Sequence, residues 1–167
     1  MEKILVLGCP GSGKSTFSKK LSEKLNIPCI YLDKLFWKEG WIERSKDDFD
    51  ALLVSELEKE KWVMDGHFSR TLSLRLSYAD TVIFFDYPRL LCLWRVLKRI
   101  FKSYGTTRSD MADGCPERFD WDFIKYVWTF KNKVRRKTIQ KLSECRHADI
   151  IVIHNKNEYK ELEKKLL

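Results

Sequence analysis

Apolar residues follow two patterns along this chain. Short, mostly apolar runs are typical of buried strands, and we expect five of them, at residues 4–7, 28–32, 61–64, 81–85 and 149–153. Between these runs apolar residues recur every three or four positions, which predicts helices at residues 17–25, about 46–59, 88–102, 120–145 and 158–167. Strands that alternate with helices indicate a parallel sheet covered by helices. The sequence therefore predicts an α/β fold.

Particular residues indicate where one of these helices begins and which side chains share a face of another. Ser45 stands three residues before an aspartate, an S/T-x-x-D/E arrangement that predicts a helix start. In the helix over 88–102 we expect Trp94 to pack inward. Arg95 and Arg99 are four residues apart, so they share another face of that helix, one that can turn toward a phosphate.

The first strand leads into a glycine-rich stretch that matches the pattern GxxxxGK(S/T), namely Gly8-Cys9-Pro10-Gly11-Ser12-Gly13-Lys14-Ser15-Thr16. The glycines let successive backbone N–H groups point at one anion. The helix that follows adds the positive end of its dipole. Lys14 can reach the β and γ phosphates, and Ser15 can offer a hydroxyl to Mg²⁺. The stretch predicts an ATP and Mg²⁺ site; the alternative is a glycine-rich turn without a ligand.

Two aspartates stand where strands end. Asp33 follows the second strand and Asp65 closes the third. Because ligands of parallel α/β sheets bind beyond the carboxyl ends of the strands, both are expected at the crevice of the glycine loop. We expect Asp33 to orient an acceptor hydroxyl or a metal-bound water, and Asp65 to be the second Mg²⁺ contact. The alternatives are a helix cap or a turn residue at Asp33, and a turn residue at Asp65.

Arginines are the next candidates. Arg70 and Arg75 follow Asp65, and their planar guanidinium groups suit bidentate phosphate binding, although surface salt bridges are an alternative. Residues 103–119 show no regular pattern and carry Arg108 and Arg118. We expect this stretch to be a lid that closes over phosphates and excludes water. The alternative is a surface loop with solvated arginines.

Aromatic and basic side chains leave further alternatives open. Phe36, Trp37 and Trp41 could stack on a base or a sugar, but we favour packing among themselves. The helix over 120–145 carries several lysines and arginines. Such a cluster is most often a solvent-exposed face, and the second alternative is a surface that binds polyanions.

Composition narrows the class of protein. A chain of 167 residues with 44% apolar side chains suits one domain, expected to span residues 1–167. The 32 basic and 24 acidic side chains leave a formal charge of +8, which favours nucleotides or nucleic acids as partners. Five cysteines without a CxxC pair are typical of reduced thiols. No apolar run approaches the ~20 residues of a membrane span. We expect a cytoplasmic monomer or homodimer without membrane contact.

The chain resembles P-loop kinases of the adenylate and shikimate kinase type, and more closely the bacterial DNA topology modulation proteins, also called adenylate kinase-related proteins. The resemblance covers essentially the whole chain. Its motifs are GCPGSGKST, YLDKLFWKEGW from Tyr31, MDGHFSRTLSLRL from Met64, ADTVIFFDYPRLLCLWRVLKR from Ala79 and TRSDMADGCPERFD from Thr107. The first is shared by many NTPases, whereas the later four together are specific.

The resemblance implies a five-stranded parallel sheet of order 2-3-1-4-5. It also implies functions for single residues. Acceptor and metal would be bound by Asp65, Gly66 and Arg70, and the adenine by the loop from about His154 to Asn157, which includes Asn155. Arg95 and Arg99 would stack on the base and contact phosphate. The lid arginines, Arg108 and Arg118, would stabilise the transferring phosphoryl group together with Arg99.

The sequence departs from adenylate kinases at the acceptor side. Those enzymes have a Pro-Arg pair soon after Asp-Gly, whereas this chain reads Asp65-Gly66-His67-Phe68-Ser69-Arg70. The segment 33–44 also lacks their monophosphate-binding helix pattern. The acceptor is therefore left open as a small hydroxyl- or phosphate-bearing molecule.

Our first hypothesis is an ATP-dependent kinase that acts on such an acceptor. The alternatives are a nucleic-acid-binding protein that uses ATP as a switch, and a weak ATPase without an acceptor.

Overall fold

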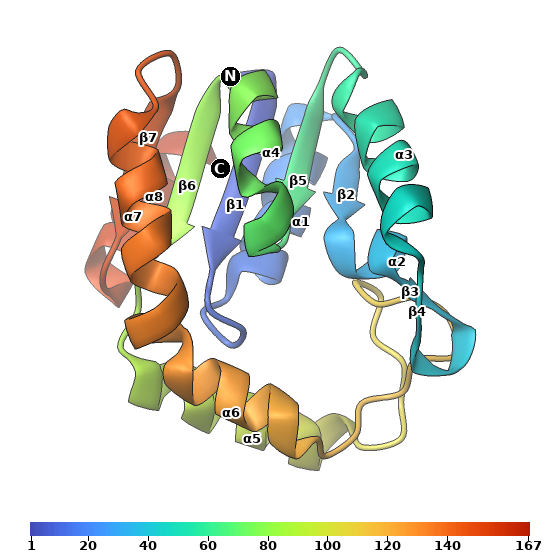
Figure 1. The fold of residues 1–167 in the computed structure, drawn as a ribbon. Helices are drawn as coiled ribbons and strands as arrows, with labels where there is room; N and C mark the ends of the chain where they lie inside the picture. Colours follow the sequence, from blue (N-terminus) through green and yellow to red (C-terminus); the bar gives the residue numbers. More distant parts are fainter.

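The computed structural model describes residues 1–167 and contains a five-stranded parallel sheet with helices on both faces (Figure 1). The strands are β1 (Lys3–Gly8), β2 (Cys29–Tyr31), β5 (Trp62–Asp65), β6 (Thr81–Phe85) and β7 (Asp149–Ile153). Their spatial order is β2-β5-β1-β6-β7. Counted along the chain, this order is 2-3-1-4-5, so the predicted fold and strand order are confirmed.

Eight α-helices connect and cover the strands. They are α1 (Lys14–Leu25), α2 (Leu32–Phe36), α3 (Lys46–Leu57), α4 (Leu72–Tyr78), α5 (Arg89–Ser103), α6 (Trp121–Phe130), α7 (Arg136–Glu144) and α8 (Lys156–Leu166). The predicted cap of α3 is confirmed, because the Ser45 hydroxyl accepts a hydrogen bond of 3.1 Å from the Asp48 amide.

Both faces of the central strands β1, β5 and β6 are buried. In β1, Ile4 and Val6 belong to one core cluster with Phe17 of α1. The alternate residues Leu5 and Leu7 belong to a second cluster, which includes side chains of α3. A strand buried on both faces has no polar side, which is why these strands are continuous apolar runs in the sequence.

The structure differs from the predicted elements in three places. β2 ends at Tyr31, so Asp33 lies in the short helix α2 rather than at the end of the strand. Trp94 is 56% exposed, whereas the α5 residues Cys92, Val96 and Ile100 are buried. Those three residues are spaced four apart on one helix face, and Trp94 lies about 200° around the helix from the first of them.

The expected single helix over residues 120–145 has three parts. A π-helical turn, η3 (Lys131–Arg135), separates α6 from α7. Such turns insert into α-helices at defined points, often near functional sites. Here the turn carries Arg135, which bonds to Asp86 after β6.

Two irregular segments lie beside each other beyond the carboxyl end of β2 (Figure 1). The first is a hairpin of β3 (Trp37–Lys38), η1 (Glu39–Trp41) and β4 (Ile42–Glu43). The second is the lid segment, residues 104–120, which forms no helix or strand apart from one bridge between Tyr104 and Glu117. Two hydrogen bonds join them, Gly40 N to Gly114 O at 3.0 Å and Trp41 Nε1 to Pro116 O at 3.1 Å. The lid segment is therefore held against the hairpin.

The remaining short element is η2 (Ser69–Thr71), just before α4. None of the helices combines the length and the apolar composition needed to cross a membrane.

Candidate functional site

The glycine-rich loop joins β1 to α1 and leaves an open cradle. At Gly13, which has φ 100°, a Cβ would meet no atom within 4 Å. At Gly11 a Cβ would lie only 2.4 Å from the Cys92 carbonyl oxygen, so the loop packs directly on α5. α1 begins without a side-chain cap and without an acidic residue in its first turn. Its first amides are therefore free to bind an anion, and the cradle fits a phosphate.

A hydroxyl and a carboxylate lie together beside this cradle. The Ser15 hydroxyl donates a hydrogen bond of 2.6 Å to Asp65 Oδ2. Asp65 is buried, and its Oδ1 has no hydrogen-bond partner, although the Lys14 Nζ lies 3.9 Å away. Burial raises the pKa of the Asp65 carboxyl, and the nearby Lys14 charge lowers it in part.

This pair of oxygen donors fits Mg²⁺, which prefers oxygen ligands and keeps several waters. No group of three or more His, Cys, Asp or Glu side chains is arranged to hold a metal ion. A magnesium ion at Ser15 and Asp65 would therefore complete its coordination with phosphate oxygens and water.

A cavity of about 930 Å³ extends from the cradle. Its lining brings together most of the side chains that the sequence indicates, including Lys14, Ser15, Thr16, Asp33, Arg95, Arg99, Arg108 and Arg118, and the glycines Gly8, Gly11, Gly13 and Gly66. Pro10 lines it too, whereas Cys9 and Ser12 are buried beneath the loop. The glycine loop, α5 and the lid segment thus surround one space.

Glu117 organises the arginines of this cavity, and sequence reasoning missed it. Its Oε1 accepts hydrogen bonds from Arg99 Nε at 3.1 Å and Nη2 at 2.9 Å. Its Oε2 forms an ion pair of 2.9 Å with Arg108 Nε. Arg108 Nη1 also donates to Asp110 Oδ2 at 2.9 Å. The buried Glu117 therefore holds an arginine of α5 and an arginine of the lid segment side by side.

The other two arginines of the lining are held less tightly. Arg95 Nη1 donates to the Ser12 carbonyl at 3.2 Å, and its guanidinium lies 5.4 Å from the centre of the Tyr87 ring. Arg118 lies 4.9 Å over the Trp41 ring and 3.7 Å from Asp120.

Cys9, Ser12 and Asp65 are buried and do not line this cavity, and three further expected site residues also lie outside it. Arg70 is exposed and forms two hydrogen bonds, of 2.8 and 2.7 Å, with Asp50. The Asn155 side chain caps α8 by accepting from the amides of Asn157 and Glu158. Arg75 is fully buried. Their residue types suit ligands, but their positions give these side chains other partners.

Arg75 instead fixes the loop that follows Asp65. Its guanidinium donates to the carbonyls of Gly66 at 2.9 Å, Phe68 at 2.8 Å and His67. Burial lowers the pKa of this guanidinium to about 9, which leaves it charged at neutral pH. Arg75 therefore positions a cavity wall without reaching the cavity.

We expect Arg75→Met to lower the free energy of unfolding by about 3 kcal/mol, because unsatisfied buried polar groups cost about 1–3 kcal/mol each. Arg70→Met is the matched control, since an exposed ion pair contributes below about 1 kcal/mol. Urea unfolding of both variants measures the difference. Equal losses in the two variants would contradict this function of Arg75.

His67 lines the cavity and was also missed by sequence reasoning. Its Nε2 lies 3.0 Å from Thr138 Oγ1, and the Thr138 hydroxyl donates to the Val134 carbonyl at 3.0 Å. Which of the His67 and Thr138 groups donates to the other depends on the tautomer of the His67 ring. The other ring nitrogen, Nδ1, is buried without a partner. Burial lowers the pKa of His67 to about 3, so the ring is neutral.

Aromatic rings form the cavity wall near Asp33. Phe36, Trp37, Trp41 and Phe68 all line it. They also pack on one another, with ring centres 4.9 Å apart for Phe36 and Trp37 and 5.2 Å apart for Phe36 and Phe68. The expected packing is present, and the same rings face the cavity.

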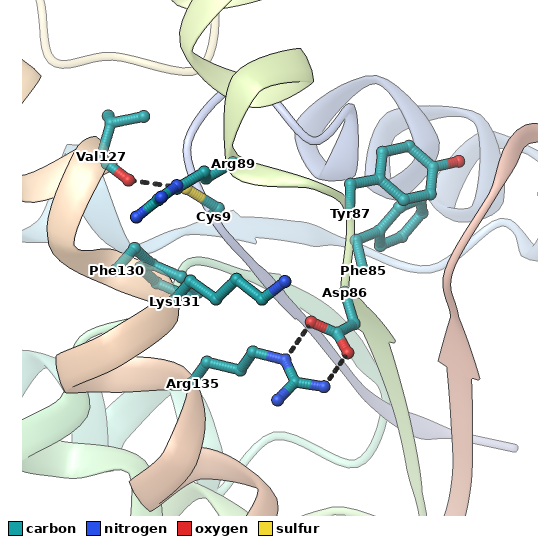
Figure 2. A pocket seen from close by; sticks show the side chains of 9 residues that line it. All are labelled: Cys9, Phe85, Asp86, Tyr87, Arg89, Val127, Phe130, Lys131 and Arg135. Atoms are coloured by element: carbon teal, nitrogen blue, oxygen red, sulfur yellow. Dashed lines mark hydrogen bonds and ion pairs between the residues drawn. The ribbon is translucent and has the colours of Figure 1, made fainter.

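A second, much smaller cavity of about 10 Å³ lies behind the glycine loop (Figure 2). Arg135 binds Asp86 there through two hydrogen bonds of 2.5 and 2.6 Å, and the Cys9 thiol lies 3.9 Å from the Val127 carbonyl. A space of this size holds at most about one water molecule. These contacts attach the helix segment 121–135 to the sheet. The charge of Arg135, one of the basic residues of this segment, is neutralised by Asp86.

Comparisons with known proteins agree with this geometry. Residues 4–113 match the family described as AAA domain. The uncharacterized protein YqaC of Bacillus subtilis is 26% identical over 151 residues, which cover 89% of this chain and 84% of that protein. The adenylate kinase of Thermotoga neapolitana is 28% identical over 106 residues, 62% of this chain but only 47% of that enzyme. The match thus spans about half of the adenylate kinase.

A solved structure shows the same fold. Shikimate kinase from Acinetobacter baumannii, in complex with shikimate, superposes with a TM-score of 0.60 at 17% identity. The superposition covers 99% of this chain and 90% of that one. At this identity the likeness concerns the fold.

Proposed function

Because the chain belongs to the AAA-domain family and is a P-loop protein of the adenylate and shikimate kinase type, we propose that it is an ATP-dependent kinase. It transfers the γ-phosphoryl group of ATP to a small acceptor. The observation that carries the proposal is the shared cavity, which joins an uncapped glycine loop to the arginine pair Arg99 and Arg108.

The glycine loop and Lys14 bind the β and γ phosphates in this proposal. Free amides at the start of α1 donate hydrogen bonds, and the Lys14 ammonium adds a positive charge. Ser15 and Asp65 hold the magnesium ion, which supplies neutralising charge for the phosphates when it is bound. Catalysis of this kind consists mainly of positioning and charge stabilisation.

Arg99 and Arg108 stabilise the charge of the group in transfer. Both guanidinium groups are already oriented by Glu117, so little reorganisation is required when a phosphoryl group approaches them. The lid segment, held by the hairpin, keeps water out of the same space.

Asp33 orients the hydroxyl of the acceptor. Burial raises the pKa of the Asp33 carboxyl, and the Lys14 charge partly opposes this shift. A general base works best when its pKa is near the working pH. Raising the pKa of the Asp33 carboxyl therefore makes it a better proton acceptor near neutral pH.

The proposal is tested by ADP formation from ATP and Mg²⁺, with and without a panel of nucleosides, nucleoside monophosphates, sugars and small alcohols. We expect at least one acceptor to stimulate ADP formation and to appear as its phosphorylated product. ADP formation that no acceptor stimulates, with inorganic phosphate as the product, would instead indicate an ATPase.

A second candidate function is ATP-dependent binding of nucleic acid. It is favoured by the net charge of +8 and by the exposed cations Lys133, Arg136 and Lys137 on η3 and α7. If they contact phosphates, the logarithm of duplex DNA affinity falls with log salt by about 0.9 per contact. Absence of DNA binding at low salt would dismiss this candidate.

A further inference from the structure

We propose that the phosphoryl acceptor carries no negative charge of its own, and that it presents hydroxyl or amino donors beside a flat or apolar face. This inference rests on the proposed kinase function. It narrows the acceptor from any hydroxyl- or phosphate-bearing molecule to uncharged or cationic hydroxyl compounds, such as nucleosides and sugars.

The acceptor part of the cavity is lined by residues of α2, the hairpin and the loop after Asp65. α2 and the hairpin lie at the β2 side of the sheet, away from β6 and β7 (Figure 1). Lys14 and Arg95, which are assigned to the nucleotide, belong to the glycine loop and α5.

Cations that could bind an anionic acceptor are engaged elsewhere. Arg75 is buried and donates to three carbonyls, and Arg70 forms two hydrogen bonds with Asp50 outside the cavity. Arg44, next to the hairpin, donates from Nε to the Leu35 carbonyl at 2.9 Å and does not line the cavity. No lysine or arginine of α2, the hairpin or the loop after Asp65 therefore lines the cavity.

The lid segment contributes two arginines to the cavity, and carboxylates lie near both of them. Arg108 contacts both Glu117 and Asp110, at 2.9 Å each. Arg118 lies near Asp120 and over the Trp41 ring. In the proposed reaction Arg108 faces the transferred phosphoryl group, so it is not available to a second anion.

A carboxylate is instead left over at this end. The Asp33 carboxylate lines the cavity and forms no hydrogen bond within the chain. It needs donors from a ligand, and hydroxyl or amino groups supply them. The negative charge of Asp33 also repels an anionic acceptor. The preference for uncharged acceptors therefore has two causes, hydrogen bonding to donors and repulsion of anions.

The aromatic wall completes the pattern. The rings of Phe36, Trp37, Trp41 and Phe68 line this end of the cavity. Rings of this kind bind flat bases and the apolar faces of sugars through their large surfaces. A molecule that matches both features has hydroxyl or amino donors on one side and a flat or apolar face on the other.

The test compares paired acceptors of which only one carries an anionic group, using the full chain with ATP and Mg²⁺. Adenosine against AMP represents the nucleosides, and D-glucose against D-gluconate represents the sugars. We expect the uncharged member of the active pair to show at least a 10-fold higher kcat/KM. The pair that is active identifies which source of hydroxyl compound the cavity takes.

The acceptor preference of Asp33→Asn is a second measurement, and a purely structural effect of the substitution would leave this preference unchanged. We expect it to lower kcat for the uncharged acceptor by about 10²-fold and to reduce the preference over the charged partner. Asp47→Asn is the control, because Asp47 is exposed in the first turn of α3 and lies outside the cavity.

The outcomes separate the inference from the proposed function. A preference for AMP or D-gluconate, or an unchanged preference in Asp33→Asn, overturns the inference and leaves a kinase. Absence of stimulation by all four acceptors, with phosphate released from ATP, overturns the kinase function and this inference with it.

Discussion

Replacement of Lys14 by alanine is expected to lower ATP-dependent turnover by about 10²–10³-fold, the usual loss when one preorganised charge or donor is removed from a site. Lys14 is the first residue of α1, which has no side-chain cap, and its side chain is only 12% exposed. No neighbouring cation takes its place at Asp65, where its Nζ lies 3.9 Å from Oδ1. Steady-state ADP formation measures the loss.

Lys24→Ala is the matched control for Lys14→Ala. Lys24 lies in the last turn of the same helix, is exposed and does not line the cavity. We expect its variant to retain full turnover, and both variants to unfold cooperatively in urea. If Lys14→Ala keeps full turnover as well, the glycine loop does not bind the reacting phosphates.

Replacement of Arg108 by alanine is expected to have a still larger effect on kcat, about 10³-fold or more, as is typical when an arginine that faces a transferring phosphoryl group is lost. ATP affinity should change much less, because the glycine loop and Lys14 are untouched. Arg108→Lys should restore only part of the rate, since lysine keeps the charge but not the planar fork that contacts both Glu117 and Asp110.

Two measurements on Arg108→Ala separate chemistry from binding. Single-turnover rates report the phosphoryl-transfer step, and equilibrium titration with an ATP analogue reports affinity. Arg70→Ala is the control, because Arg70 pairs with Asp50 outside the cavity. A loss confined to affinity would assign Arg108 to nucleotide binding and remove it from the transfer step.

Local chemistry explains which features could be predicted from the sequence. The central strands β1, β5 and β6 are buried on both faces, so each is an apolar run that can be recognised without knowing its neighbours. The cap at Ser45 is a contact between residues three positions apart, and the glycine pattern from Gly8 to Thr16 is contiguous in the sequence. Features of this kind can be recognised from a short stretch of sequence alone.

Features that depend on distant contacts could not be predicted in this way. Arg70 and Arg75 have the same side chain, but one is exposed beside Asp50 and the other is buried among carbonyls. Glu117 acquires its function from Arg99, which is 18 residues away. His67 depends on Thr138, which is 71 residues away. Residue type gives the chemistry of a side chain, whereas the packed fold decides its partners.

The most direct test of the central claim is a crystal structure of the full chain with a non-hydrolysable ATP analogue and Mg²⁺. We predict that the β and γ phosphates accept hydrogen bonds from the backbone amides of the glycine loop. The ion should lie about 2.1 Å from Ser15 Oγ, with Asp65 bound to it directly or through one water. A nucleotide bound away from the loop, or an ion remote from Asp65, would contradict the account.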